Sequence, residues 1–148
     1  MKKYFALGCL LMIAVFSQSC LKRGLKDLPV FTDAKIDRFD FEYRWNDNGT
    51  FRVIRLTTST PVVNGNSMTV TTTVPAASGT FTTAVRDQVT ASNITGMCNI
   101  STAATIQPAN GSPMLGLPGN YAKPVAYQVT AADGKTTITW QVQVNFVK

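Results

Sequence analysis

Apolar and polar residues alternate along most of the chain, which is typical of strands with one buried and one exposed face. Between residues 38 and 45, aromatic residues occupy every odd position and charged residues every even position. The Asn-Asp-Asn-Gly sequence at 46–49 favours a turn, because Asn and Gly tolerate positive φ. We therefore expect residues 50–58 to return along the first strand as a hairpin, with Arg52 across from its acidic residues.

The same alternation predicts two more hairpins. One turns at 64–66 and joins 61–63 to 67–74, and the other turns at Asp133-Gly134 and joins 127–130 to 136–147. Shorter strands are expected at three places, which are 88–91, 98–101 and 104–106. A Gly- and Pro-rich loop is expected at 108–124, and no segment has convincing helical periodicity. About seven strands without a helix predict an all-β fold, an Ig-like antiparallel β-sandwich that occupies residues 34–148.

The first residues have the features of an export signal. Lys2 and Lys3 precede an uncharged apolar run at 4–16, which is too short for a permanent membrane span. Ser19 then precedes Cys20 in the manner of a bacterial lipobox, although Ser17 stands where that box usually has Leu. We predict a lipoprotein signal peptide at 1–19 and a lipidated Cys20 that starts a tether over 20–33. The alternative is an ordinary secretory signal followed by a chance Cys. Several acyl chains on Cys20 give stable membrane attachment.

Charge and cysteine usage agree with an exported, anchored chain. The 148 residues include 14 Lys and Arg against 8 Asp and Glu, a net charge of +6. Two of the positive charges leave with the signal peptide, and a basic group at 22–35 lies beside the anchor, where it faces anionic head groups. Nucleic acid is not an expected partner of such a chain. Cys9 also leaves, so Cys98 has no disulfide partner and is expected to be a small buried residue.

The absence of His removes several chemistries. The chain has no His at all, so it cannot form a Ser-His-Asp triad or an imidazole metal site. Asp40 and Glu42 share one strand face and could form a carboxylate pair, but Arg38 and Arg44 on that face favour ion pairs instead. Asp47 lies in a turn sequence and not in a calcium loop. We therefore predict a non-enzymatic protein without a metal or a cofactor.

The C-terminal half is similar to a known type of domain. Residues 70–75 form a strand that ends in Val-Pro, and Ser101–Gly111 precede the sequence Tyr127-Gln-Val-Thr-Ala-Ala-Asp133-Gly. This pattern resembles the Ig-like domains of unknown function in Bacteroidetes cell-envelope lipoproteins, over residues 67–148 and more weakly over 35–66. The resemblance implies a secreted, lipid-anchored sandwich and brings no catalytic residues. Some members of this type lie beside TonB-dependent transporters or in glycan-handling loci, and others belong to adhesion proteins.

The candidate binding residues lie in the long loop. Loops usually run over the surface, so apolar residues among Gly and Pro there could form a contact site. We predict that this site contains Met114, Leu115, Leu117 and Tyr121. The alternative is that the loop folds back and plugs one end of the sandwich. Tyr43 and Trp45 could also stack on a sugar, but their alternation with charges favours the core.

These observations together predict a lipid-anchored protein of the outer membrane, on either the cell-surface or the periplasmic side. Its expected role is that of a binding or accessory module beside an outer-membrane assembly, such as a transporter for glycans or peptides, or that of a glycan-binding protein. The alternative is a structural spacer or adhesion module with no small-molecule ligand.

Overall fold

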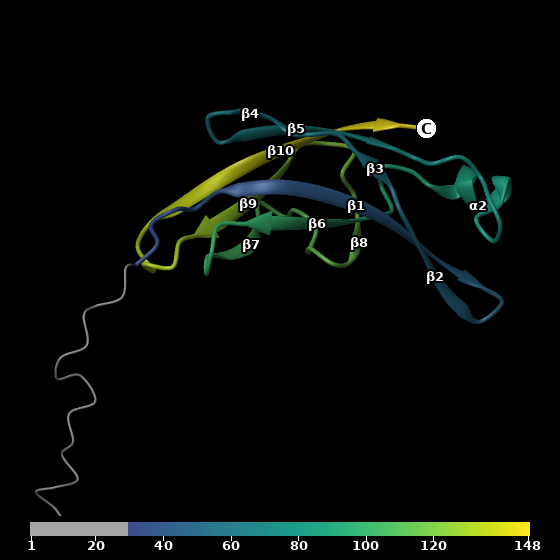
Figure 1. Cartoon of the computed structure of the whole chain (residues 1–148), viewed down its shortest axis with the longest axis horizontal. Helices are drawn as coiled ribbons and strands as arrows, with labels where there is room; N and C mark the ends of the chain where they lie inside the picture. The colour runs from purple at the N-terminus through teal and green to yellow at the C-terminus, as the bar shows by residue number, and fades with distance from the viewer. Residues whose placement is uncertain (1–29) are drawn as a thin grey trace, which may run out of the picture.

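Ten strands and one short helix make up residues 30–148, the part of the chain that the computed structural model describes (Figure 1). The predicted signal peptide (1–19), Cys20 and nearly all of the tether (20–33) lie outside these residues. The elements in chain order are β1 (Ile36–Asp47), β2 (Thr50–Arg55), β3 (Thr57–Thr58), β4 (Val62–Asn64), β5 (Ser67–Thr73), α2 (Thr83–Gln88), β6 (Ile94–Ile100), β7 (Thr105–Ala109), β8 (Pro118–Gly119), β9 (Val125–Thr130) and β10 (Thr137–Val147).

The strands form two sheets, and the predicted all-β sandwich is confirmed. The smaller sheet has the order β2-β1-β6-β8, and the larger has the order β3-β5-β10-β9-β7, with β4 also paired to β5. The three predicted hairpins are present as β1–β2, β4–β5 and β9–β10. The chain leaves the smaller sheet at Leu56, so the single strand expected at 50–58 is divided between the two sheets.

The sandwich is not purely antiparallel, which corrects one expectation. Residues Ser67–Thr73 of β5 run parallel to Gln141–Val147 of β10. The two strands are separated by more than sixty residues of sequence, which is ample for the crossover that parallel neighbours need. Alternation along a strand shows which side chains are buried, but it carries no information about the direction of the neighbouring strand.

The expectation of no helix, and of a strand at 88–91, is wrong. The helix α2 covers Thr83–Gln88, and the chain turns directly after it. Thr82 caps the helix, because its hydroxyl accepts a hydrogen bond from the Val85 amide at 3.3 Å. The helix is too short to show a helical repeat in the sequence, so it was not visible as a periodic pattern.

The core lies between the sheets and is built on alternate residues of the long strands. In β1 the odd residues Phe39, Phe41 and Tyr43 are buried, and in β10 the even residues from Trp140 to Val144 are buried. The predicted inward faces are therefore confirmed. The rings of Phe39 and Phe41 lie 5.2 Å apart, and Tyr127 of β9 lies 5.6 Å from Phe39.

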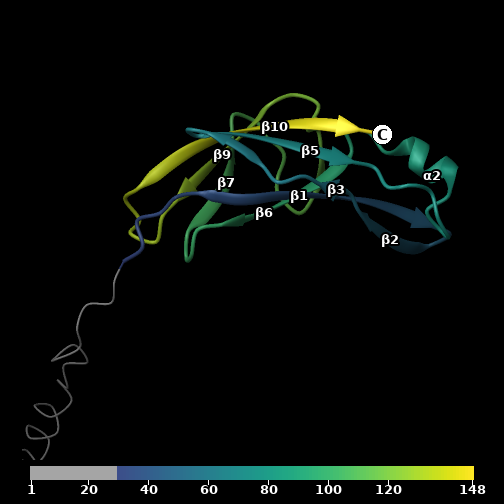
Figure 2. The same cartoon turned by 45° about the horizontal axis from the view of Figure 1, so that its top comes forward.

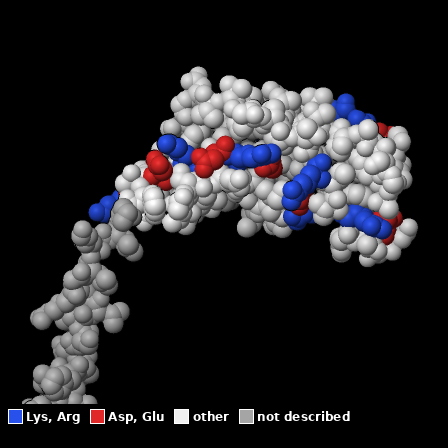
Figure 3. Space-filling model, viewed as in Figure 1, with Lys and Arg blue, Asp and Glu red and all other residues white. Residues whose placement is uncertain are grey.

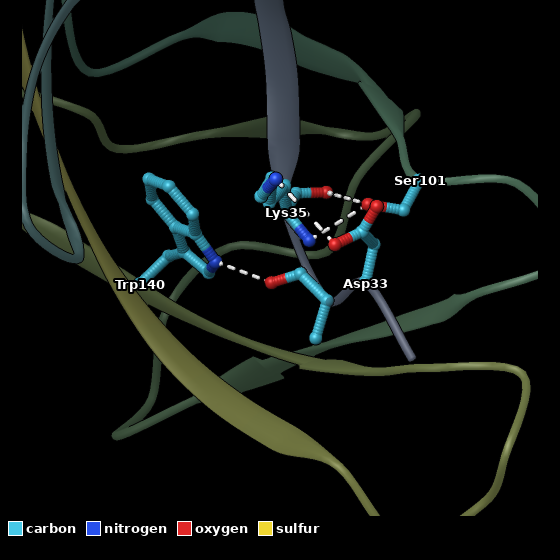
Figure 4. Close-up of polar contacts among 5 residues, drawn as sticks. Asp33, Lys35, Ser101 and Trp140 are labelled. Atoms are coloured by element: carbon cyan, nitrogen blue, oxygen red, sulfur yellow. Dashed lines mark hydrogen bonds and ion pairs between the residues drawn. The ribbon is translucent and has the colours of Figure 1, made fainter. Parts of the chain in front are cut away.

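Hydrogen bonds and an ion pair surround the segment at which the described chain begins, and Figure 4 shows those made by Asp33, Lys35, Ser101 and Trp140. The buried indole nitrogen of Trp140 donates to the Ala34 carbonyl at 2.9 Å. The Lys35 amide donates to the Ser101 hydroxyl at 2.9 Å, and the Ser101 amide donates to the Lys35 carbonyl at 3.1 Å. The remaining bond runs from the Asp133 amide to Phe31, and Lys35 pairs with Asp33. This segment is therefore held by β10 and by the end of β6.

Candidate functional site

The loop between β7 and β9 divides the four predicted site residues into three groups. Met114 and Leu117 are 62% and 52% exposed, as expected for a contact surface. Leu115 is half-buried and packs against the core. Tyr121 is fully buried, so its assignment to the contact site is wrong. Both alternatives for the loop therefore apply in part, because it covers the core with Leu115 and presents two apolar side chains outward.

Tyr121 is buried because the end of the loop enters the aromatic core. Its ring centroid lies 5.1 Å from that of Phe41 and 6.2 Å from that of Phe39. Its amide donates to the Ala91 carbonyl at 2.7 Å, and its hydroxyl is hydrogen bonded to the Tyr127 hydroxyl at 3.3 Å. Burial raises the pKa of both tyrosines. Gly96 leaves the space that the ring occupies, since an added Cβ there would lie 2.7 Å from the Tyr121 Cζ.

The loop is fixed to both sheets, so its exposed residues have defined positions. The Tyr127 hydroxyl donates to the Pro113 carbonyl at 2.8 Å. The Gly116 amide donates to the Gly96 carbonyl at 2.9 Å, and the Gly116 carbonyl accepts from the Arg44 guanidinium at 2.8 Å. Gly116 has a φ of +79°, which a residue with a side chain rarely adopts. The turn from Met114 to Leu117 thus lies against the outward face of β1.

An apolar cleft of about 490 Å³ lies beside this loop. Its lining includes Trp45, Phe51 and Pro118, with Arg44 and Asn46 as its polar members. Phe51 is 82% exposed, the highest value among the large apolar residues of the described chain. Contiguous apolar surface of this kind is typical of a contact site. We call the set Trp45, Phe51, Met114, Leu117 and Pro118 the tip surface.

Sequence reasoning missed the contribution of Phe51 to the site. Phe51 lies more than sixty residues before the loop that supplies Met114, Leu117 and Pro118, so its position beside that loop is not visible in the sequence. The prediction that Tyr43 and Trp45 belong to the core is confirmed. Tyr43 is buried, and Trp45 is half-buried with its ring 5.6 Å from that of Phe81. The exposed aromatic position was detectable, because Phe51 pairs with Asn46 on the polar side of the hairpin.

The outward face of β1 carries paired charges, as the sequence predicted. Arg38 lies 2.7 Å from Asp40, and the Arg44 Nε donates to Glu42 at 2.6 Å. Figure 3 shows these and neighbouring charged side chains in a row across the face over β1. Arg52 lies directly across from Trp45 and pairs with Asp47 of the turn at 3.3 Å, so the expectation that it lies across from the acidic residues Asp40 and Glu42 is wrong. The carboxylates of Asp40, Glu42 and Asp47 are therefore each neutralised by a neighbouring arginine.

Two further predictions concern metal binding and Cys98. Among residues 30–148, no three His, Cys, Asp or Glu side chains form a group that could hold a metal ion. The turn at 46–49 is closed by a hydrogen bond from the Gly49 amide to the Asn46 side chain at 2.6 Å. Cys98 is half-buried, and burial raises the pKa of its thiol to about 11. It is therefore protonated near neutral pH and poorly nucleophilic.

No helix within residues 30–148 is long and apolar enough to cross a membrane.

Comparison with known proteins gives a family and several solved structures, two of which are described here. A family model described as DUF5018-related matches residues 36–143. A solved protein from Bacteroides fragilis, provisionally described as secreted, is 33% identical with a TM-score of 0.71, over 81% of this chain and 100% of that one. A solved protein from Bacteroides thetaiotaomicron, provisionally described as a glycoside hydrolase, is 20% identical with a TM-score of 0.46, over 82% of this chain and 27% of that one. No curated protein matches.

Proposed function

The chain belongs to the DUF5018-related family, and from that premise we propose that it is a non-enzymatic, lipid-anchored module of the cell envelope that binds a partner through its tip surface. The expected partner is an outer-membrane assembly such as a nutrient transporter. The relative from Bacteroides fragilis, described as secreted, supports a location outside the cytoplasm. The anchor rests on the lipobox-like sequence that ends at Cys20.

The observation that carries the binding role is the exposure of Met114 and Leu117 on a rigidly held loop, whose Pro118 lines a cleft together with the exposed Phe51. Phe51, Met114 and Leu117 are each more than half exposed, although burying such side chains is worth about 1.5–3 kcal/mol each. The loop that presents two of them is fixed by Arg44 and Tyr127. A surface that is already ordered loses little conformational freedom when a partner covers it.

The position of the tip surface also supports the proposal. In both cartoon views, the described chain begins at one end of the molecule and the β1–β2 turn lies at the other (Figures 1 and 2). An anchor that precedes residue 30 would therefore attach at the end away from Phe51. This arrangement leaves the tip surface accessible to a neighbouring protein.

Replacing Cys20 with Ala tests the anchor. We expect the wild-type chain in the membrane fraction and the Cys20→Ala chain in the soluble extract, because an acyl chain contributes about 0.8 kcal/mol per buried CH₂. Fractionation of Gram-negative cells followed by immunoblotting measures this. Cys98→Ala is the matched control and should leave the distribution unchanged. A Cys20→Ala chain that stays with the membrane would contradict lipid anchoring.

Replacing Leu117 with Asp tests the binding surface. The side chain is 52% exposed, so the variant should fold, while a carboxylate in the contact area should reduce partner recovery about tenfold or more. The measurement is the amount of each membrane protein that co-purifies with the tagged chain after mild detergent extraction, by quantitative mass spectrometry. Val62→Asp is the matched control, since Val62 is 70% exposed on the β4 hairpin. Equal recovery with Leu117→Asp and wild type would exclude this surface.

A further inference from the structure

The strand β2 has a free edge that differs from the other sheet edges of residues 30–148. It is the end strand of the smaller sheet, and β1 is its one strand neighbour there. The opposite edge of that sheet is β8, which has two residues, one of them Pro118. In the larger sheet, the edges are β7, which contains Pro108, and the short β3 and β4.

Edge strands are usually protected from pairing by Pro, by a bulge, by charged side chains or by being very short. The strand β2 has six residues without Pro and pairs with β1 in an uninterrupted register from Thr50 to Arg55, so its charged residues Arg52 and Arg55 are its one protection of these kinds. Figure 1 shows β2 projecting beyond the main body of the sandwich. The unpaired backbone groups of this edge are therefore available to another strand.

The register shows which groups of β2 point outward. The Leu56 amide donates to the Phe41 carbonyl at 2.9 Å, so in this antiparallel ladder the even residues of β2 direct their backbone groups toward β1. The odd residues Phe51, Val53 and Arg55 therefore direct their N–H and C=O groups to the free edge. These three residues also share one sheet face with Arg44 and Asn46, which are the register partners of Val53 and Phe51.

The residues Phe51, Val53 and Arg55, whose backbone groups face the free edge, can pair with the same three residues of a second, antiparallel β2. If a second β2 is placed antiparallel with Val53 opposite Val53, Phe51 lies opposite Arg55 of the second copy, and the reverse. The three outward-facing pairs can then exchange about six backbone hydrogen bonds. On the other face, Arg52 lies opposite Ile54 of the second copy, so no two like charges are directly opposed.

Side-chain chemistry favours the same arrangement. Arg55 forms no ion pair with any residue of the described chain, whereas Arg52 is paired with Asp47. A guanidinium over an aromatic face is favourable, and Phe51 is 82% exposed. The two Val53 side chains, each 53% exposed, would cover one another at the symmetry axis. The self-complementary pattern favours a second copy over an unrelated strand.

We propose that two copies of this chain associate through antiparallel pairing of their β2 edges, with a two-fold axis at Val53. The two smaller sheets then form one continuous sheet of eight strands. Such an isologous contact places each residue against a fixed counterpart in the other copy. Anchoring of both copies in one membrane would raise their effective concentration. This inference goes beyond the proposed function, because it is carried by the edge of β2 and not by the loop with Met114 and Leu117, although Phe51 belongs to both surfaces.

Charge exchange at Val53 tests the proposal, because this position faces itself only in the proposed dimer. Two full-length copies with different tags are expressed together, and their co-purification is measured in mild detergent. We expect wild-type copies to co-purify. Val53→Lys alone and Val53→Asp alone should each lower the yield about tenfold, since like charges then face one another. Co-expression of the Lys and Asp variants should restore it.

The control is Val63→Lys, which changes a residue of similar exposure (51%) on the edge strand β4. It should leave co-purification at the wild-type level. Wild-type copies that do not co-purify would overturn the proposal, and so would a Lys and Asp combination that is no better than either variant alone. Leu117→Asp should leave this association intact, so failure of the dimer and failure of the tip surface can be distinguished.

Discussion

Replacing Gly96 with Ala should cost about 3 kcal/mol of folding free energy or prevent folding altogether. Gly96 lies in the middle of β6, and its missing side chain leaves room for two aromatic rings. An added Cβ would lie 2.7 Å from the Tyr121 Cζ and 2.8 Å from the Phe39 Cε1, with the Tyr121 hydroxyl closer still. Neither ring can move aside easily, because both are fully buried and contact Phe41. Urea unfolding followed by tryptophan fluorescence measures the loss.

A second substitution identifies the cause of this loss. The nearest atom to the added Cβ is the Tyr121 hydroxyl oxygen, so Tyr121→Phe should relieve part of the clash. The variant that carries both Gly96→Ala and Tyr121→Phe should lose less folding free energy than the two single variants lose together. Such a difference measures the coupling between the two neighbouring residues. A Gly96→Ala chain with wild-type stability would show that the rings do not occupy the positions described above.

Replacing Trp140 with Ala should destabilise the fold by about 3–5 kcal/mol. Trp140 is 4% exposed, and its loss would leave a large cavity between β10 and the start of β1. The substitution also removes the donor to the Ala34 carbonyl, which is buried and then unsatisfied. We expect a lower unfolding midpoint in urea and faster amide hydrogen exchange at residues 34–36.

Two comparison variants separate packing from hydrogen bonding at this site. Trp140→Phe retains most of the ring volume but not the indole N–H, so it should cost about 1–3 kcal/mol and still accelerate exchange near Ala34. Thr139→Ala changes the neighbouring exposed position and should have an effect of about 0.5 kcal/mol or less. If amide hydrogens near Ala34 exchanged as slowly in Trp140→Phe as in the wild type, the hydrogen bond from the indole would have no role in holding this segment.

The sequence was most informative in strands where polar and apolar residues alternate in step with the alternation of side chains between the two faces of the sheet. Residues 38–45 and 137–146 alternate without interruption, so their inward faces could be assigned from polarity alone. The turn residues Asn48, Gly49 and Gly134 all adopt positive φ, which is why the hairpins could be located from local chemistry.

The sequence was least informative where distant segments meet. Tyr121 follows a Gly- and Pro-rich stretch that reads as exposed, and its burial depends on contacts with Phe41 and Ala91. One local signal was present, because a glycine inside a strand often marks a close approach by another group. Gly96 is such a glycine, but the sequence did not indicate which residue approaches it. The tip surface was missed in part for the same reason, since Phe51 and Pro118 meet only in the folded chain.

The central position of β10 in the larger sheet has a consequence for the order of events during synthesis. Its neighbours β5 and β9 contact one another only through it, and β5 is made some seventy residues earlier. The larger sheet therefore cannot assemble on a nascent chain that still lacks residues 137–147.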